Sequence, residues 1–278
     1  MKAIKIFCIS LFATISLASN VHSQSNVPNN TIQDLNFDGM VSVLAFGDSI
    51  TRGIGDFIRV GEEVTSGLPT PPGEAGYPLR LETILGVSVE NKGIRGEFLS
   101  DSGIFRFAQT VANSPADYVV ISEGANDTFL SATSFELKRD MQAMINMSKA
   151  LGKAPMIATI PTPCCGHSGS IPFINSYNQE FRDLANINNV LFADVEEAFD
   201  ITCSGDECYL LNLPEGLHPN VKGYDAMAQT IMAAFLGIDL LGPGGNTLLA
   251  QALGVDPSSI VVKSPPAATT PSGDDTTQ

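Results

Sequence analysis

Two hydrophobic patterns repeat along this chain: short apolar runs, and longer stretches that are apolar on one side only. Short runs bounded by turn residues are typical of buried strands, and apolar residues three or four apart are typical of helices. In the stretch from Ser134 to Leu151 the apolar residues fall on one helical face, and its methionines belong to the core. The predicted strands are Met40–Phe46, Val87–Asn91, Tyr118–Ser122, Met156–Ile160 and Val190–Ala193. The predicted helices are Tyr77–Leu85, Ser102–Ala112, Ser134–Leu151, Ile171–Ile187 and Val221–Leu236, with a further one near Asn246–Leu253.

Strands and helices alternate in this prediction. Consecutive strands separated by helices pair in parallel through right-handed crossovers. We therefore expect an α/β fold, a three-layer α/β/α sandwich with a flavodoxin-like, five-stranded parallel sheet. Three long loops, Thr51–Gly76, Pro161–Ser170 and Val195–Leu217, leave the same edge of that sheet and are expected to wall a substrate cleft.

The two ends of the chain differ in composition from the middle. Lys2 and Lys5 precede the apolar segment Ile6–Leu17, which is typical of a secretory signal peptide ending at Ser23, with Ala18 as an alternative. An uncleaved membrane anchor is less favoured because the apolar run is short. We expect a signal peptide over 1–23, a polar arm over 24–39, one domain over 40–262, and a disordered tail over 263–278.

The chain is acidic, and export makes it more so. Removal of Lys2 and Lys5 with the signal peptide takes the formal net charge from −15 to −17. Such a charge argues against nucleic acid and anionic membrane surfaces as partners. We expect a secreted or periplasmic protein with no stable membrane anchor.

Four cysteines remain after the signal peptide. They are Cys164, Cys165, Cys203 and Cys208. An exported protein favours structural disulfides, and four cysteines allow three pairings, among which the sequence does not choose. Zinc is less favoured, because adjacent cysteines and a Cys-x4-Cys pair do not have the usual ligand spacing.

Candidate chemistry lies at the ends of predicted strands. Ser49 stands two residues beyond Gly47, where the first apolar run ends, and open α/β sheets bind ligands at that edge. Far along the chain, Glu215 and His218 stand three residues apart before a predicted helix. A serine, a histidine and an acid are the parts of a nucleophilic hydrolase. The other histidine of the expected mature chain, His167, is interpreted as a loop residue with a chance of touching substrate.

Neither serine motif in the chain is the nucleophile elbow of an α/β-hydrolase. That elbow requires a glycine two residues after the serine, and Thr51 stands there instead. The segment from Gly166 to Ser170 also fails at its last position and lacks a strand-to-helix context, so Ser168 is a weak candidate.

Four separate blocks together resemble the GDSL, or SGNH, hydrolase family. The blocks are Gly47-Asp48-Ser49, Asn91-Lys-Gly93, Gly124-Ala-Asn126-Asp127 and Glu215-x-x-His218-Pro, and the resemblance spans about 40 to 236. It implies the fold predicted above, with Ser49 as nucleophile and His218 as base. It also implies an oxyanion hole made by the amides of Ser49 and Gly93 and the side chain of Asn126. No metal and no organic cofactor is implied.

The chain departs from the family pattern at Glu215, where the family has Asp. Glutamate is one methylene longer, so the backbone must recede or the side chain must fold back. Three alternatives stay open. Glu215 is the triad acid, a nearby carboxylate such as Asp206 or Glu207 replaces it, or a backbone carbonyl orients His218.

The sequence thus predicts a secreted serine esterase acting on a small-molecule or polysaccharide ester. Without a large apolar insertion or a lid-like amphipathic helix, short acyl or acetyl esters are favoured over long triglycerides. The rival hypotheses are an acyltransferase using the same site and a non-catalytic carbohydrate- or ligand-binding module with a decayed triad. A nucleotide-binding protein is disfavoured because no phosphate-binding glycine pattern opens a helix.

Overall fold

The computed structural model describes residues 32–62, 67–68, 75–203, 208–240, 247, 249–251 and 253–256. The predicted signal peptide (1–23), the first half of the arm and the predicted tail (263–278) lie outside these residues, as does part of the helix predicted near 246–253. In the described part of the arm, the amides of Leu35 and Asn36 donate to the Asp117 carboxylate.

A single parallel sheet forms the centre of the molecule. Its strands are β1 (Ser42–Gly47), β2 (Ser88–Gly93), β3 (Tyr118–Ser122), β4 (Ala154–Ala158) and β5 (Leu191–Ala193). The spatial order is β2-β1-β3-β4-β5, and every neighbouring pair is parallel. The predicted five-stranded parallel sheet is therefore confirmed.

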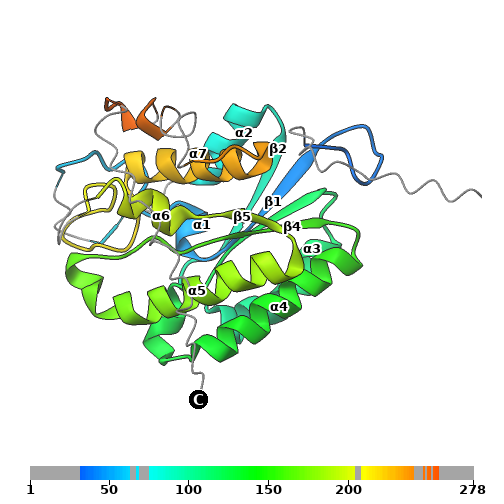
Figure 1. Cartoon of the computed structure of the whole chain (residues 1–278), viewed down its shortest axis with the longest axis horizontal. Helices are drawn as coiled ribbons and strands as arrows, with labels where there is room; N and C mark the ends of the chain where they lie inside the picture. The colour runs from blue at the N-terminus through cyan, green and yellow to red at the C-terminus, as the bar shows by residue number, and fades with distance from the viewer. Residues whose placement is uncertain are drawn as a thin grey trace, which may run out of the picture.

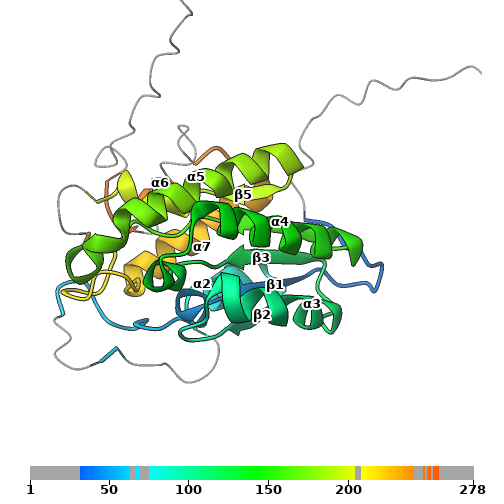
Figure 2. The same ribbon diagram turned by 90° about the horizontal axis from the view of Figure 1, so that it is seen from below.

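Helices cover both faces of the sheet (Figures 1 and 2). One layer holds α2 (Tyr77–Leu85), α6 (Val195–Asp200) and α7 (Val221–Leu236); the other holds α3 (Ile104–Ala112), α4 (Ser134–Ala150) and α5 (Ile171–Asn188). Covering both faces explains why the central strands are apolar throughout: residues 43–46 of β1 and 119–121 of β3 are fully buried. The structure thus has the predicted three-layer α/β/α architecture.

The predicted elements match the observed ones to within about two residues, but short helical segments were not predicted. These are Ser49–Arg52, the 3₁₀ helices Asn126–Leu130 and Cys165–Ser170, and α6. The loop predicted over Val195–Leu217 begins with the helix α6. Its cap is Asp194, whose side chain accepts from the amide of Glu197. An Asp followed three residues later by Glu is a start signal for a helix, but six residues are too few for hydrophobic periodicity to indicate one. A π-helical turn, Leu99–Gly103, also precedes α3.

The carboxyl ends of the first three strands are aligned. Gly47 at the end of β1 lies opposite Gly93 of β2 and Ser122 of β3. The segments that follow these strands therefore leave the sheet together, and the short helix α1 (Ser49–Arg52) begins there. Among the described residues, no helix has the length and apolarity needed to cross a bilayer.

Candidate active site

Ser49 is the first residue of α1, immediately beyond the central strand β1. The preceding residue, Asp48, caps this helix, because its carboxylate accepts from the Ile50 amide at 2.8 Å. Gly47 is glycine for a packing reason: a Cβ there would come 2.0 Å from Thr51 Oγ1 and 2.2 Å from the carbonyl oxygen of Ser122. The Gly-Asp-Ser sequence therefore forms a tight, buried corner that aims the serine side chain out of the sheet.

His218 lies just before α7, and its imidazole reaches the serine. Its Nε2 is 2.8 Å from Ser49 Oγ although the two residues are 169 positions apart in the sequence. The neighbouring Asn220 caps α7, accepting from the amides of Lys222 and Gly223. The Asn220 side chain also donates to the carbonyl oxygens of Tyr209 and Leu211, so the chain around the histidine is held on both sides.

The Glu215 side chain folds back onto the segment that follows it. One carboxylate oxygen, Oε1, is 2.8 Å from His218 Nδ1, and the other, Oε2, accepts from the amides of Leu217 and His218, each at 2.9 Å. The extra methylene of glutamate is thus accommodated by folding back, which is one of the two arrangements expected from the sequence. Of the alternative acids, Asp206 and Glu207 lie outside the described residues.

These bonds determine the protonation states in the site. Burial opposes the charged form of Glu215, but the bonds from the His218 ring and from the two backbone amides outweigh it, so its pKa is lowered. A carboxylate only accepts hydrogen bonds, so in the neutral imidazole of His218 the proton belongs on Nδ1, and Nε2 can accept from the Ser49 hydroxyl. Ser49, His218 and Glu215 therefore form one continuous hydrogen-bonded chain that can accept the serine proton.

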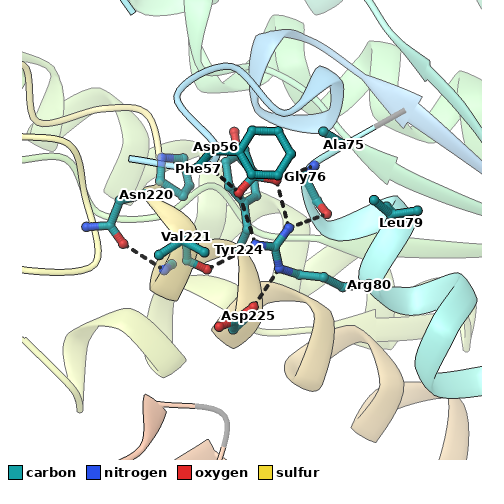
Figure 3. A network of polar contacts seen from close by, with 12 residues as sticks. Asp56, Phe57, Ala75, Gly76, Leu79, Arg80, Asn220, Val221, Tyr224 and Asp225 are labelled. Atoms are coloured by element: carbon teal, nitrogen blue, oxygen red, sulfur yellow. Dashed lines mark hydrogen bonds and ion pairs between the residues drawn. The ribbon is translucent and has the colours of Figure 1, made fainter. Parts of the chain in front are cut away.

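The half-buried Arg80 links the loop after α1, the helix α2 and the start of α7 (Figure 3). Arg80 on α2 binds both carboxylate oxygens of Asp56 and also binds Asp225 on α7. It donates in addition to the carbonyl oxygens of Gly76 and Val221. The loop after α1 and the start of α7 are therefore fixed to the same guanidinium group.

The three predicted oxyanion donors differ in whether they have a hydrogen available for a substrate oxygen. Ser49, as the first residue of a helix, has an amide with no helical acceptor. The Asn126 side chain donates to the Glu97 carbonyl at 2.8 Å, and its NH₂ group has a second hydrogen to offer. The Gly93 amide, in contrast, donates to Asn91 Oδ1 at 2.9 Å, and a Cβ on Gly93 would lie 2.2 Å from the backbone nitrogen of Arg52. Packing thus accounts for this glycine, and its role as an oxyanion donor stays a prediction.

A second glycine, Gly96, lies in the same segment and was not among the predicted site residues. Gly96 is exposed, with φ of +73°, and within the described chain its amide is paired with no backbone acceptor. The next residue, Glu97, is the one whose carbonyl binds the Asn126 side chain. The segment Gly93-Ile-Arg-Gly96 carries two glycines three residues apart, and this spacing was the available sign that a turn follows β2. The second glycine fits that turn because glycine tolerates positive φ.

Acidic side chains are buried beneath the site. Burial, partly offset by the Ile50 amide and by His218, raises the pKa of Asp48 to about 7. Burial and the neighbouring Asp48 carboxylate likewise raise the pKa of Glu123 well above its usual value. Asp127 is buried too, but accepts from the amides of Leu99 and Ser100 and from the Ser100 hydroxyl. No group of three or more metal-binding side chains occurs among the described residues.

The cysteines divide into two pairs. Cys203 and Cys208 form a disulfide, which confirms that the chain contains one, while Cys164 and Cys165 remain as thiols. His167 follows two residues later, and its Nδ1 is 2.7 Å from the Glu215 carbonyl oxygen. Together with Phe129 and Phe173 it lines a pocket of about 240 Å³. Ser168, the weak serine candidate, lies instead in another pocket, with Cys164 and Cys203.

Comparison with known proteins identifies relatives of the chain. A family model described as GDSL-like lipase/acylhydrolase matches residues 45–226, a range that contains Ser49, Asn126, Glu215 and His218. An acetylxylan esterase from Xylanibacter ruminicola is 26% identical over 225 residues, which cover 70% of this chain and 43% of that protein. The chain therefore aligns with less than half the length of this relative.

Solved structures share the fold at low sequence identity. A lipase/acylhydrolase from Enterococcus faecalis is 23% identical with a TM-score of 0.56, and the match covers 71% of this chain and 96% of that one. An acetylxylan esterase from Geobacillus stearothermophilus is 24% identical with a TM-score of 0.55, covering 72% and 95%. With the family model matched over well more than half of its length, the chain belongs to the GDSL-like lipase/acylhydrolase family.

Proposed function

We propose that this protein is an exported serine esterase that removes short acyl groups, above all acetyl groups, from a small-molecule or polysaccharide ester. The observation that carries the proposal is the continuous chain of 2.8 Å contacts from Ser49 Oγ to His218 Nε2 and from His218 Nδ1 to Glu215 Oε1. In this reaction His218 takes the serine proton as Oγ attacks the ester carbonyl. It then returns the proton to the leaving alcohol, and water releases the acyl group in a second step.

The negative oxygen formed by this attack requires hydrogen-bond donors. We assign this role to the Ser49 amide and the Asn126 side chain, and Gly96 is a stronger candidate for the third donor than Gly93, because the Gly93 amide is already bonded to Asn91. Loss of one oxyanion donor typically costs about 10²–10³ in rate. The variant Asn126→Ala is expected to lose kcat by that factor while binding of substrate changes little.

A pocket next to the Glu215 loop, reached through His167, fits a sugar-linked substrate. Phe129, 63% exposed, and Phe173, 38% exposed, line the pocket that also contains His167. Flat aromatic faces beside polar groups suit amphipathic ligands such as sugar rings. The acetylxylan esterase relatives named above act on an acetylated polysaccharide by their names, which agrees with this choice.

A fluorophosphonate probe and a series of p-nitrophenyl esters from acetyl to palmitoyl test the proposal together. We expect labelling at Ser49, highest activity on the acetyl ester, and loss of both in Ser49→Ala. Folded protein that does not react with the probe would contradict the esterase and favour a binding module. Product analysis with an added acceptor alcohol separates the remaining rival, since an acyltransferase yields the new ester in place of free acid.

A further inference from the structure

One turn holds the loop that carries the triad acid. The turn consists of residues 164–167, after β4, and it donates to the carbonyl oxygens of three consecutive residues of the acid loop. The Gly166 amide donates to Pro214, His167 Nδ1 to Glu215, and the Cys164 amide to Gly216, at 3.1, 2.7 and 2.7 Å. The packing is equally close, because a Cβ on Gly216 would lie 2.2 Å from the Cys164 carbonyl oxygen. The position of Glu215 therefore depends on the conformation of this turn.

The same turn begins with two adjacent cysteines whose sulfurs face each other. Cys165 Sγ lies 2.9 Å from Cys164 Sγ, less than 1 Å beyond the length of about 2.05 Å of a disulfide bond. The other two cysteines of the expected mature chain are already bonded to each other. Cys165 also has φ of +50°, a backbone conformation that is uncommon for a residue with a Cβ. The turn thus holds an unusual conformation in which the two thiols are close to bonding distance.

We propose that Cys164 and Cys165 are a redox pair that closes to a disulfide between adjacent residues and thereby locks the turn that holds Glu215. The oxidant is a disulfide of the export compartment, represented in the test by oxidised glutathione. One cysteine thiolate attacks a sulfur of oxidised glutathione, which forms a mixed disulfide and releases one reduced glutathione. The second cysteine then attacks the cysteine sulfur of this mixed disulfide and releases the second reduced glutathione. Two S–H bonds of the protein are replaced by one S–S bond, and the glutathione disulfide is reduced to two thiols.

The bond and the acid loop are coupled through this shared conformation. The arrangement that offers three donors to the acid loop is the same one that brings the sulfurs together, so each stabilises the other. Such coupling is reciprocal: whatever favours the closed disulfide also favours the held loop, and the reverse. With both cysteines as thiols, Glu215 Oε1 already lies 2.8 Å from His218 Nδ1. Oxidation is therefore expected to stabilise this arrangement against alternative ones, and reduction to lower its population.

The pair is also expected to be easy to reduce. Adjacent Cα atoms across a trans peptide are about 3.8 Å apart, less than the 4.4–6.8 Å at which disulfides are usually formed, and such deviations store strain. A strained bond is opened by weaker reductants than an ordinary structural disulfide. The chain therefore combines a structural disulfide, Cys203–Cys208, with a second one that responds to the redox state of the surroundings.

Mass spectrometry tests the existence of the bond without reference to activity. Trypsin places Cys164 and Cys165 in one peptide, residues 154–182, and the other two cysteines in a different one, residues 183–222. We equilibrate the mature protein with oxidised and reduced glutathione, block thiols with iodoacetamide under denaturing conditions, and digest. The expected result is a peptide 154–182 lighter by two hydrogens and without alkyl groups in the oxidised sample, and carrying two alkyl groups in the reduced one. Full alkylation after oxidation, or a link to the peptide 183–222, would overturn the proposal.

Kinetics on p-nitrophenyl acetate test the effect on Glu215, and this part rests on the proposed esterase function. We expect kcat to fall by about fivefold or more on reduction, with KM unchanged. For the variant Cys165→Ser, kcat is expected to equal that of the chemically reduced parent in both the oxidising and the reducing buffer. The double variant Cys203→Ser/Cys208→Ser, which keeps only the adjacent pair, is expected to retain the redox response.

The possible results separate the two proposals. A disulfide in peptide 154–182 with equal kcat in both buffers would refute the coupling to Glu215. A protein that forms the disulfide but hydrolyses no ester in either state refutes the proposed function and leaves the redox pair supported. A redox response that disappears in the Cys203→Ser/Cys208→Ser variant assigns the effect to the other disulfide and overturns the inference.

Discussion

The two ends of the proposed triad are held in different ways. Ser49 is the first residue of α1 and His218 lies three residues before α7, and the caps of these helices, Asp48 and Asn220, are buried. Glu215 stands on a loop that is held by another loop, through carbonyl oxygens and a folded side chain. The two residues proposed to exchange the proton are thus fixed by the framework of the fold. The residue proposed to orient the imidazole depends on local contacts, which a single substitution or the proposed redox change would alter.

Removal of the acid gives the largest expected effect. Glu215→Ala takes away the acceptor of His218 Nδ1 and leaves the imidazole free to turn, so kcat/KM on p-nitrophenyl acetate should fall by as much as ~10⁴. Glu215→Asp should retain substantial activity, because a shorter carboxylate can still reach Nδ1 if the loop moves closer. Equal activity of Glu215→Ala and the parent would mean that another group orients the histidine.

Disruption of the contacts of Arg80, which belong to the framework of the fold, should instead lower the free energy of unfolding. Arg80→Ala leaves Asp56, whose side chain is fully buried, without its cationic partner. Breaking a buried ion pair on one side costs about 3–5 kcal/mol, measurable as a lower midpoint in urea unfolding. The matched control is Lys92→Ala, which removes an exposed pair with Glu90 and should cost less than about 1 kcal/mol. Equal losses in the two variants would contradict the framework role of Arg80.

A smaller change in activity is expected from the turn beside the acid. His167→Ala removes the hydrogen bond to the Glu215 carbonyl, so kcat should fall by about tenfold, the equivalent of 1.4 kcal/mol in the barrier, with KM unchanged. Ser168→Ala, at the residue that follows His167, serves as the control and should keep the parent activity. A rise in KM without a loss of kcat would indicate that His167 contacts substrate and does not position Glu215.

The smallest effect concerns the buried acids below Ser49, and it depends on pH. The pKa of Glu123 is raised in the folded protein, so the folded state binds a proton more tightly than the unfolded state does. This contribution to stability is complete below the ordinary pKa of a glutamate and is lost as pH rises through the folded value. Glu123→Gln should therefore unfold at a higher temperature than the parent at pH 8 and at a similar one at pH 4. Between pH 4 and pH 8 the melting temperature of the parent should decrease more than that of Glu123→Gln. Equal decreases in the two proteins would contradict the prediction.

Local patterns were sufficient for most of the fold. Tyr77–Leu85, Tyr118–Ser122 and Val221–Leu236 were predicted with the bounds that the structure has. These segments were predictable because each combines a clear apolar pattern with recognisable ends, such as the Asn220 cap before α7. The short helix α6 was missed because six residues give too little periodicity to distinguish a helix from a loop.

The site was predictable in its residue types and less so in its bonds. Ser49, His218 and Glu215 were named from motif spacing, and the structure brings all three together. Gly93 was named as a donor because its neighbours fit a motif, yet its amide is bonded to Asn91. This bond joins residues two apart, as in an Asx turn, so the asparagine two residues before the glycine was a local signal that could have predicted it.

The amino-acid sequence alone determined the alternation of strands and helices, and with it the parallel sheet and the edge at which Ser49 would stand, because these follow from periodicities of a few residues. Tertiary structure alone decided how Glu215 folds back, which cysteines meet, and which turn receives the carbonyl oxygens of the acid loop. The contacts between the turn and the acid loop join segments some fifty residues apart, as with His167 and Glu215, and they hold the loop in which Glu215 folds back. Their distances are set by the packing of the whole sheet, so they could be known only once the chain had been folded around it.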